Sequence, residues 1–285
     1  MIRGNALSLG QMASLACTLE VCAPKPGNVH RGADFEDVTL QDFLASAIAI
    51  GPVFDQADQL SLGELILRSV QATANVCRTN TNLGMLLLLA PLAKAHLAAN
   101  LQVAAKLVID ASTAADAASI YEAIRLAKPG GMQKSAEHDI ADEAPPHILE
   151  AMHLAAERDF IARQYAGGFE ELFGTVVPLL TDPELASLSL SQRIVHAHVS
   201  LMATFPDTLI LRKMGEEKAQ QSAVIAQRVL DAGPPMQEDY LQQLGNLDFW
   251  LRCDGHRRNP GTTADMIAAG LFVCLRQGSI TAPFV

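Results

Sequence analysis

Four short polar segments rich in Gly, Pro, Asn and Thr interrupt a chain that is otherwise dominated by Ala and Leu. They span residues 24–28, 79–84, 207–215 and 259–265. Irregular backbone at helix ends leaves N–H groups unpaired, and such groups can hold a phosphate. Because the segments lie far apart in the sequence, they form one site only if the fold brings them to one cleft.

The first segment carries one cation in a rigid frame. Lys25 lies between two prolines and precedes Pro26 and Gly27, so the loop limits the directions that its ammonium can take. Lys25 could bind a phosphate as a point charge, although the same sequence is also a strong helix breaker. Glu20 lies on the last turn of the preceding helix, where a negative charge opposes the helix dipole. This position suggests a partner such as Lys25 or a metal ion, although a solvent-exposed glutamate costs little and is the commoner case.

Asparagine and threonine side chains crowd the second segment. Asn80, Thr81 and Gly84 directly precede an apolar run, a pattern that predicts a helix N-terminus and an anion-binding nest. Helix capping accounts for one or two of the four hydrogen-bonding side chains at 79–82. The others favour a polar ligand.

The third segment pairs a carboxylate with an arginine. Asp207 and Thr208 begin a predicted helix, and Arg212 follows one turn later. A magnesium-bound polyphosphate requires such a pair, with oxygen for the metal and guanidinium for the phosphate. Asp207 is also a natural N-cap, so a structural role stays open.

The fourth segment combines an arginine, a glycine loop and a helix start. Arg258 precedes Asn259 and Gly261, and the helix that follows presents its N-terminus to a ligand. Asp265 could reach a metal ion from the first turn of this helix. The segment is the strongest anion-site signal in the chain, although it matches no general phosphate-binding motif.

Composition narrows the classes of function. A net charge of -10 argues against nucleic-acid binding, so an anionic small-molecule substrate needs local cations and a divalent ion such as Mg²⁺. Five scattered cysteines without metal-type spacing indicate reduced thiols and a cytoplasmic protein. No secretory signal pattern is recognised, and the longest apolar run, 85–92, is far shorter than the roughly 20 residues of a membrane span.

Apolar spacing at three and four residues predicts an all-α fold, a single-domain multi-helix orthogonal bundle over residues 1–285. Residues 128–146 form the least helical stretch and could be a lid over a site or a solvated acidic loop. The Ala/Leu-rich helices could bury a homodimer interface. The predicted helices span 7–22, 40–53, 61–77, 83–98, 101–110, 113–127, 147–173, 186–204, 207–231, 236–252 and 262–277.

The order and wording of the polar segments resemble the triphosphoribosyl-dephospho-CoA synthase family. That family has Pro-Lys-Pro-Gly after a glutamate-bearing helix, then Asn-Thr-x-x-Gly before an apolar helix. Asp-Thr with a later arginine and glycine follows, and Pro-Gly-x-x-Ala-Asp closes the series. The matching residues are Glu20, 24–27, Asn80, Thr81, Gly84, Asp207, Thr208, Arg212, Gly215 and 260–265.

The resemblance implies an all-helical enzyme that transfers the triphosphoribosyl group of ATP to the 2′-hydroxyl of dephospho-CoA and releases adenine. The product is the precursor of a prosthetic group of acyl-carrier subunits. Such a glycosyl transfer needs a carboxylate near the sugar, a base for the hydroxyl and cations for the triphosphate. The expected assignments are Glu20, Asp207 and Asp265 for the metal or the ribosyl centre, Lys25, Arg212 and Arg258 for phosphates, and Asn80 and Thr81 for polar orientation.

The chain also departs from the family pattern. Asn82-Leu83 replaces a His-Lys pair, residues 34–37 replace a His-x-Asp-Met segment, and residues 163–166 lack the glutamate of an Arg-Gly-Glu-Ala segment. Residues 121–131 resemble a branch associated with one-carbon and methanopterin metabolism. A pentose-phosphate transferase in the synthesis of a pterin-type cofactor is therefore an alternative. A non-catalytic, nucleotide-binding helical protein, with the motifs as caps and breakers, is another.

Overall fold

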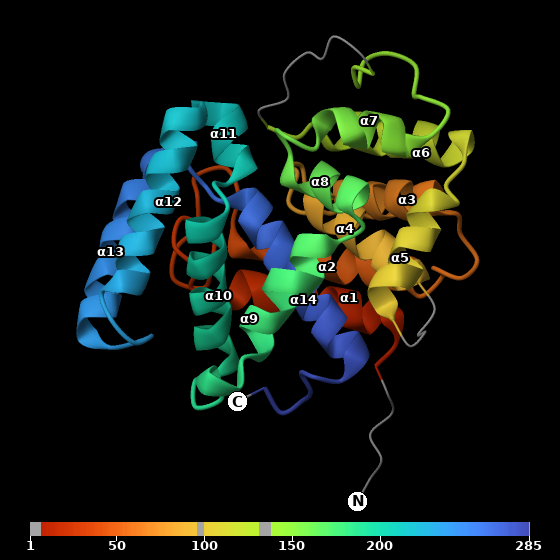
Figure 1. The fold of residues 1–285 in the computed structure, drawn as a ribbon. Helices are drawn as coiled ribbons and strands as arrows, with labels where there is room; N and C mark the ends of the chain where they lie inside the picture. The colour runs from red at the N-terminus through yellow and green to blue at the C-terminus, as the bar shows by residue number, and fades with distance from the viewer. Residues whose placement is uncertain (1–6, 96–99, 131–137, 285) are drawn as a thin grey trace, which may run out of the picture.

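The structure is a computed structural model that describes residues 7–95, 100–130 and 138–284. It confirms the all-α, multi-helix fold (Figure 1). The helices are α1 (Leu9–Cys22), α2 (Leu40–Phe54), α3 (Leu62–Ala74), α4 (Leu83–Lys94), α5 (Leu101–Asp110), α6 (Ala114–Ala127), α7 (Ile148–Ala155), α8 (Phe160–Gly167), α9 (Val177–Thr181), α10 (Leu190–Thr204), α11 (Thr208–Met214), α12 (Glu216–Asp231), α13 (Glu238–Arg252) and α14 (Gly261–Gln277). A π-helical turn covers Leu172–Val176, a 3₁₀ turn covers Pro183–Leu185, and a short extended segment, β1, covers Cys253–His256.

Several helices begin where their sequences encode a cap. In α1, the Ser8 hydroxyl accepts from the Gln11 N–H, and the Gln11 side chain accepts from the Ser8 N–H. Such reciprocal capping satisfies two of the N–H groups that a helix start leaves without partners. The same arrangement begins α2, α3, α6 and α10.

Two predicted helices were wrong in their continuity. The helix expected over 147–173 is divided into α7 and α8, because the Asp159 carboxylate caps Ile161 and Ala162 and so begins a new helix. The helix expected over 207–231 is divided into α11 and α12 at Gly215, whose φ of 86° lies in a region that favours glycine. The end of the predicted helix 83–98 lies outside the described residues, as do residues 131–137 of the candidate lid.

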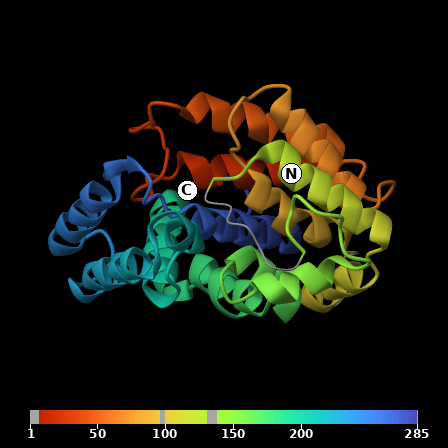
Figure 2. The ribbon, with the colours of Figure 1, turned by 90° about the horizontal axis from the view of Figure 1, so that it is seen from above.

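The last helix, α14, forms the centre of the core. It packs against α1, α4, α9 and α10, and most of its residues from Thr262 to Leu275 are buried. Figures 1 and 2 place it between the N-terminal helices and the helices of the middle of the chain. A second apolar cluster joins α10, α11, α12 and α13. Because α14 is central, its N-terminal residues can meet segments from both ends of the chain.

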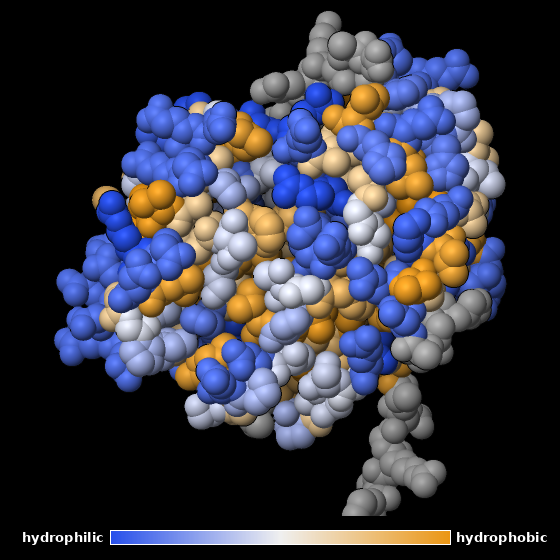
Figure 3. All heavy atoms as spheres, in the orientation of Figure 1, coloured by the Kyte–Doolittle hydropathy of each residue, from blue (hydrophilic) through white to orange (hydrophobic). Residues whose placement is uncertain are grey.

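Polar side chains cover much of the face seen in Figure 3, over α12 and α13 on one side and over α6 and α7 on the other. No single described helix has both the length and the apolar composition of a membrane span. One bent pair, Leu190–Thr204 with Thr208–Met214 at 56°, passes the same test of length and composition. All five cysteines lie among the described residues, and each is a free thiol.

Candidate active site

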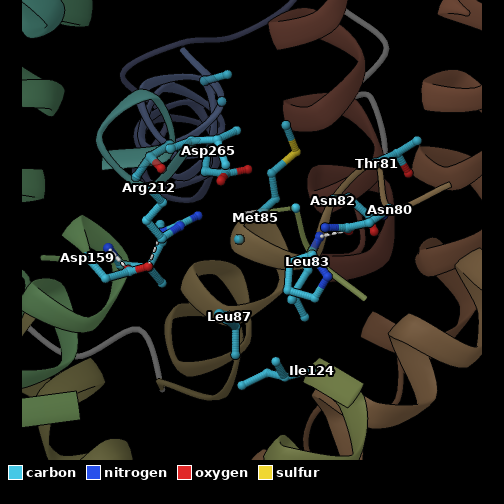
Figure 4. Close-up of a pocket in the computed structure, with 18 of the residues that line it drawn as sticks. Asn80, Thr81, Asn82, Leu83, Met85, Leu87, Ile124, Asp159, Arg212 and Asp265 are labelled. Carbon is cyan, nitrogen blue, oxygen red and sulfur yellow. Dashed lines mark hydrogen bonds and ion pairs between the residues drawn. The ribbon is translucent and has the colours of Figure 1, made fainter. Parts of the chain in front are cut away.

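The four polar segments converge on one cavity of about 840 Å³, as the sequence predicted. Its wall is built from the end of α1, the loop after it, the start of α4, the α6–α8 region, α11 and the start of α14. Figure 4 shows Asp265, Arg212 and Asp159 on one side of the cavity and Asn80, Thr81 and Asn82 on the other. The helix termini thus supply the polar part of the wall.

The predicted site residues divide into two groups. Eight line the cavity: Glu20, Asn80, Thr81, Gly84, Arg212, Asn259, Gly261 and Asp265. Six lie behind or beside that wall: Lys25, Pro26, Gly27, Asp207, Thr208 and Arg258. The contacts of the second group indicate what each does there.

Asp265 presents its carboxylate to the cavity from the first turn of α14. The carboxylate packs on Gly84, where an added Cβ would lie 2.0 Å from Oδ2. Within the described part of the chain, Asp265 makes no hydrogen bond or ion pair of its own. Burial raises the pKa of Asp265 well above its usual range, the carboxylates of Glu20 and Asp207 raise it further, and Arg212 opposes the rise. Asp265 is therefore a desolvated carboxylate that lacks a fixed partner.

Glu20 faces the same cavity but is paired. Lys25 Nζ lies 2.9 Å from Glu20 Oε1, and the two side chains are only 0% and 2% exposed. The ammonium also donates to the backbone carbonyls of Glu20 and Ala23. Burial raises the pKa of Glu20, and the Lys25 charge partly offsets this rise. Lys25 is thus the partner of Glu20 at the end of α1, and its N–H donors are directed at the Glu20 carboxylate and the backbone carbonyls.

Gly27 fixes the loop that carries Lys25. Its φ is 73°, its N–H donates to Asp248 Oδ1 over 2.8 Å, and an added Cβ would lie 2.7 Å from Leu251. Arg252 donates to the Asn28 carbonyl, which is the other end of the loop. These contacts hold residues 25–28 against α13, so the position of Lys25 depends on a helix more than two hundred residues away in sequence.

Asp207 joins two helix starts behind the cavity. Its Oδ1 accepts from the Leu209 and Ile210 N–H groups, and its Oδ2 accepts from the N–H and hydroxyl of Thr263 at 2.8 Å each. Burial raises the pKa of Asp207, and these four hydrogen bonds offset the rise. The neighbouring Thr208 donates to the Thr262 hydroxyl. Asp207 therefore caps α11 and positions the turn of α14 that carries Asp265.

The two predicted arginines are held differently. Arg212 reaches the cavity and forms an ion pair with Asp159, as Figure 4 shows. Arg258 lies over the Trp250 ring, donates to the Trp250 carbonyl and lies 3.6 Å from Asp254. Arg258 thus fastens the end of α13 to the following turn, while Arg212 lines the cavity with Asp159 as its ion-pair partner.

The second segment uses its polar groups mainly for its own structure. Asn80 Oδ1 caps α4 at the Leu83 N–H, and the Thr81 hydroxyl donates to Ser46. Asn82 exchanges hydrogen bonds with Thr73. These contacts use side-chain atoms that the sequence suggested for a ligand, although all of 79–84 lines the cavity.

Some wall residues were missed by the sequence reasoning. Asp159 and Lys213 line the cavity, the first as the ion-pair partner of Arg212 and the second as its neighbour in the chain. Asp159 lay inside a predicted continuous helix, so its capping position was hidden. Lys213 directly follows a predicted phosphate ligand, and this adjacency was the available signal.

A family model described as ATP:dephospho-CoA triphosphoribosyl transferase (CitG) matches residues 6–282. The chain belongs to this family. The match covers all four polar segments and confirms the resemblance that their order suggested. It also agrees with the fold, because the resemblance implied an all-helical protein.

Two proteins that are similar to this chain carry related names. A protein of Pseudomonas syringae pv. tomato, named as a candidate 2-(5''-triphosphoribosyl)-3'-dephosphocoenzyme-A synthase, is 32% identical over 106 residues, which are 37% of this chain and 36% of the relative. The matched region thus spans little more than a third of that relative's length. A crystal structure of a candidate triphosphoribosyl-dephospho-CoA synthase from Archaeoglobus fulgidus superposes with a TM-score of 0.64 at 28% identity, over 83% of this chain and 100% of the other.

Magnesium binding stays a prediction. No group of three or more His, Cys, Asp and Glu side chains within residues 7–95, 100–130 and 138–284 is arranged to hold a metal ion. Mg²⁺ in nucleotide sites is usually held by one or two carboxylates together with phosphate oxygens, so a full protein cage is not required. Asp265 fits such a role, because its oxygens face the cavity and lack a fixed partner.

Proposed function

We propose that this protein transfers the triphosphoribosyl group of ATP to a hydroxyl of dephospho-CoA, with release of adenine. The observation that carries the proposal is the unpaired, desolvated Asp265 carboxylate in a cavity whose wall also bears Glu20 and Arg212. A sugar that loses its base develops positive charge at C1′, and a nearby carboxylate stabilises that charge. Membership of the family supplies the identity of the group transferred.

The proposed chemistry breaks one bond and forms another at the same carbon. The bond between C1′ of the ribose and the adenine nitrogen breaks, and the acceptor oxygen bonds to C1′. The hydroxyl proton passes to a carboxylate and adenine takes up a proton as it leaves, so that in the net reaction the hydroxyl proton ends on adenine. Asp265 suits proton exchange because its carboxylate lines the cavity and burial raises its pKa above the ordinary value of an aspartate.

Glu20 and Arg212 take complementary parts in this proposal. Lys25 favours the charged form of Glu20, so Glu20 adds negative potential near the sugar while Asp265 exchanges a proton. Arg212 lies beside Asp265 and would bind the phosphate nearest the ribose. Mg²⁺, where bound to the phosphates, would neutralise part of their charge.

The direct test is release of free adenine. Purified protein, ATP, Mg²⁺ and dephospho-CoA should yield adenine and a product heavier than dephospho-CoA by one triphosphoribosyl group, measured by mass spectrometry. An Asp265→Asn variant should retain its fold and lose this activity. Folded wild-type protein that releases no adenine with any acceptor would refute the proposal.

The acceptor is tested in the same assay. Pterin-type acceptors offered beside dephospho-CoA separate the two transferase alternatives, because only the true acceptor supports adenine release. A non-catalytic nucleotide-binding protein would bind ATP and release none. A cytoplasmic location and a homodimer stay predictions, and size-exclusion chromatography with light scattering measures the second.

A further inference from the structure

The cavity wall carries charges of both signs. Glu20 and Asp265 supply negative charge, and Arg212 acts on the pKa values of both Asp265 and the adjacent Lys213. Arg212 therefore lies within electrostatic range of Asp265 and of Lys213. Successive residues of a helix point about 100° apart, so the two cations of α11 extend to different parts of the wall. The wall thus carries two neighbouring cations, Arg212 and Lys213, in the same region as the Asp265 carboxylate.

The Lys213 ammonium has only weak hydrogen-bond partners. Its Nζ lies 3.4 Å from the His256 carbonyl and 3.4 Å from Asn259 Oδ1, which are long contacts to neutral oxygens. Among the described residues, no carboxylate lies within 4.0 Å of this ammonium. Burial lowers the pKa of Lys213; the carboxylates of Asp207 and Asp37 oppose this shift from a distance, and the Arg212 charge adds to it. A half-buried cation beside a second cation gains strongly from an anion.

The surroundings of Lys213 position it at the wall. An added Cβ at Gly130 would lie 3.2 Å from Lys213 Cε, so the backbone after α6 passes close to the side chain. The chain at 256–259 holds it from the other side. The helix dipole also stabilises a basic residue in the last turn of a helix. The dipole explains the charge at this position but does not require the ammonium to line the cavity.

We propose that Lys213 binds the distal phosphates of the nucleotide and so makes the site selective for a triphosphate chain. This inference rests on the proposed function for the orientation of the substrate, with its sugar at Asp265. The phosphate attached to the ribose then reaches Arg212, and only a longer chain reaches Lys213. Nucleoside monophosphates lack the group that Lys213 binds.

Isothermal titration with ATP, AMP and inorganic tripolyphosphate, at fixed Mg²⁺, tests the assignment. Lys213→Met keeps the length of the side chain and removes its charge. It should weaken ATP and tripolyphosphate binding about tenfold and leave AMP binding unchanged, because one charge-assisted contact is lost. Lys213→Arg should retain the preference for ATP over AMP. Lys218→Met is the matched control, because Lys218 contacts Gln221 on α12 outside the cavity wall.

The outcomes separate this inference from the proposed function. Unchanged ATP affinity in folded Lys213→Met, or an equal loss for AMP and ATP, refutes the role of Lys213 even where adenine release persists. A selective loss of tripolyphosphate binding supports the role even where the wild type releases no adenine, which refutes only the transfer reaction. Wild-type protein that binds neither ATP nor tripolyphosphate refutes both.

Discussion

Gly84→Ala tests whether activity depends on the position of the Asp265 carboxylate. An added Cβ would lie 2.0 Å from Asp265 Oδ2 and 2.5 Å from Cγ. The oxygen must move out to the 3.4 Å at which ordinary contact begins, a shift of about 1.4 Å. Displacement of a reacting group by about 1 Å lowers the rate about 100-fold, which is about 2.7 kcal/mol of transition-state stabilisation.

The assay compares kcat/KM for adenine release with the free energy of unfolding in urea. We expect a loss of about 100-fold or more in kcat/KM for Gly84→Ala. Its stability should change by less than about 1 kcal/mol, because alanine favours a helix and the carboxylate can turn into the cavity.

The control is Gly245→Ala within α13, where an added Cβ meets no atom within 4 Å. This variant should be more stable by about 0.5–1 kcal/mol, with unchanged activity. Folded Gly84→Ala with wild-type kcat/KM would refute the assignment of Asp265 to the reacting centre.

Three further substitutions test the wall and the residues behind it. Lys25→Met leaves the Glu20 carboxylate buried without its partner, so the free energy of unfolding in urea should fall by about 3–5 kcal/mol. Adding Glu20→Gln should recover part of this loss, and an unchanged urea midpoint for Lys25→Met would contradict the pairing. Asp207→Ala removes four hydrogen bonds at two helix starts and should destabilise by about 2 kcal/mol or more in the same titration, with adenine release also reduced because the Asp265 turn loses its anchor. Folding raises the pKa of Asp265 well above its ordinary value of 3.8, so ionisation of this carboxyl disfavours the folded state at any pH above 3.8. Asp265→Asn should therefore raise the free energy of unfolding at neutral pH. This gain should shrink as the pH falls toward 3.8. A gain that grows in acid would show that the sign is wrong.

The helices and their polar ends could be read from the sequence. Apolar stretches rich in Ala and Leu predicted α1, α4 and α14, and reciprocal caps such as Ser8 with Gln11 fix where several helices begin. Local signals of this kind act over a few residues and need no tertiary contact. The division at Gly215 was also local, but the helical pattern on either side masked it.

The roles of the polar residues depended on tertiary structure. Lys25 and Asp207 have the residue types of ligands, yet their donors and acceptors are satisfied by Glu20 and Thr263 behind the wall. Asp265 also lies near a helix start and has the residue type of a ligand, and its carboxylate contacts Gly84 and lines the cavity. Type and spacing determine what a side chain can do, because they fix its chemistry and its helix end. Only the packing of distant segments decides which hydrogen-bond or ion-pair partners a side chain contacts. A buried pair of this kind is difficult to replace by a contact to a ligand, because breaking it leaves a buried polar group without a partner.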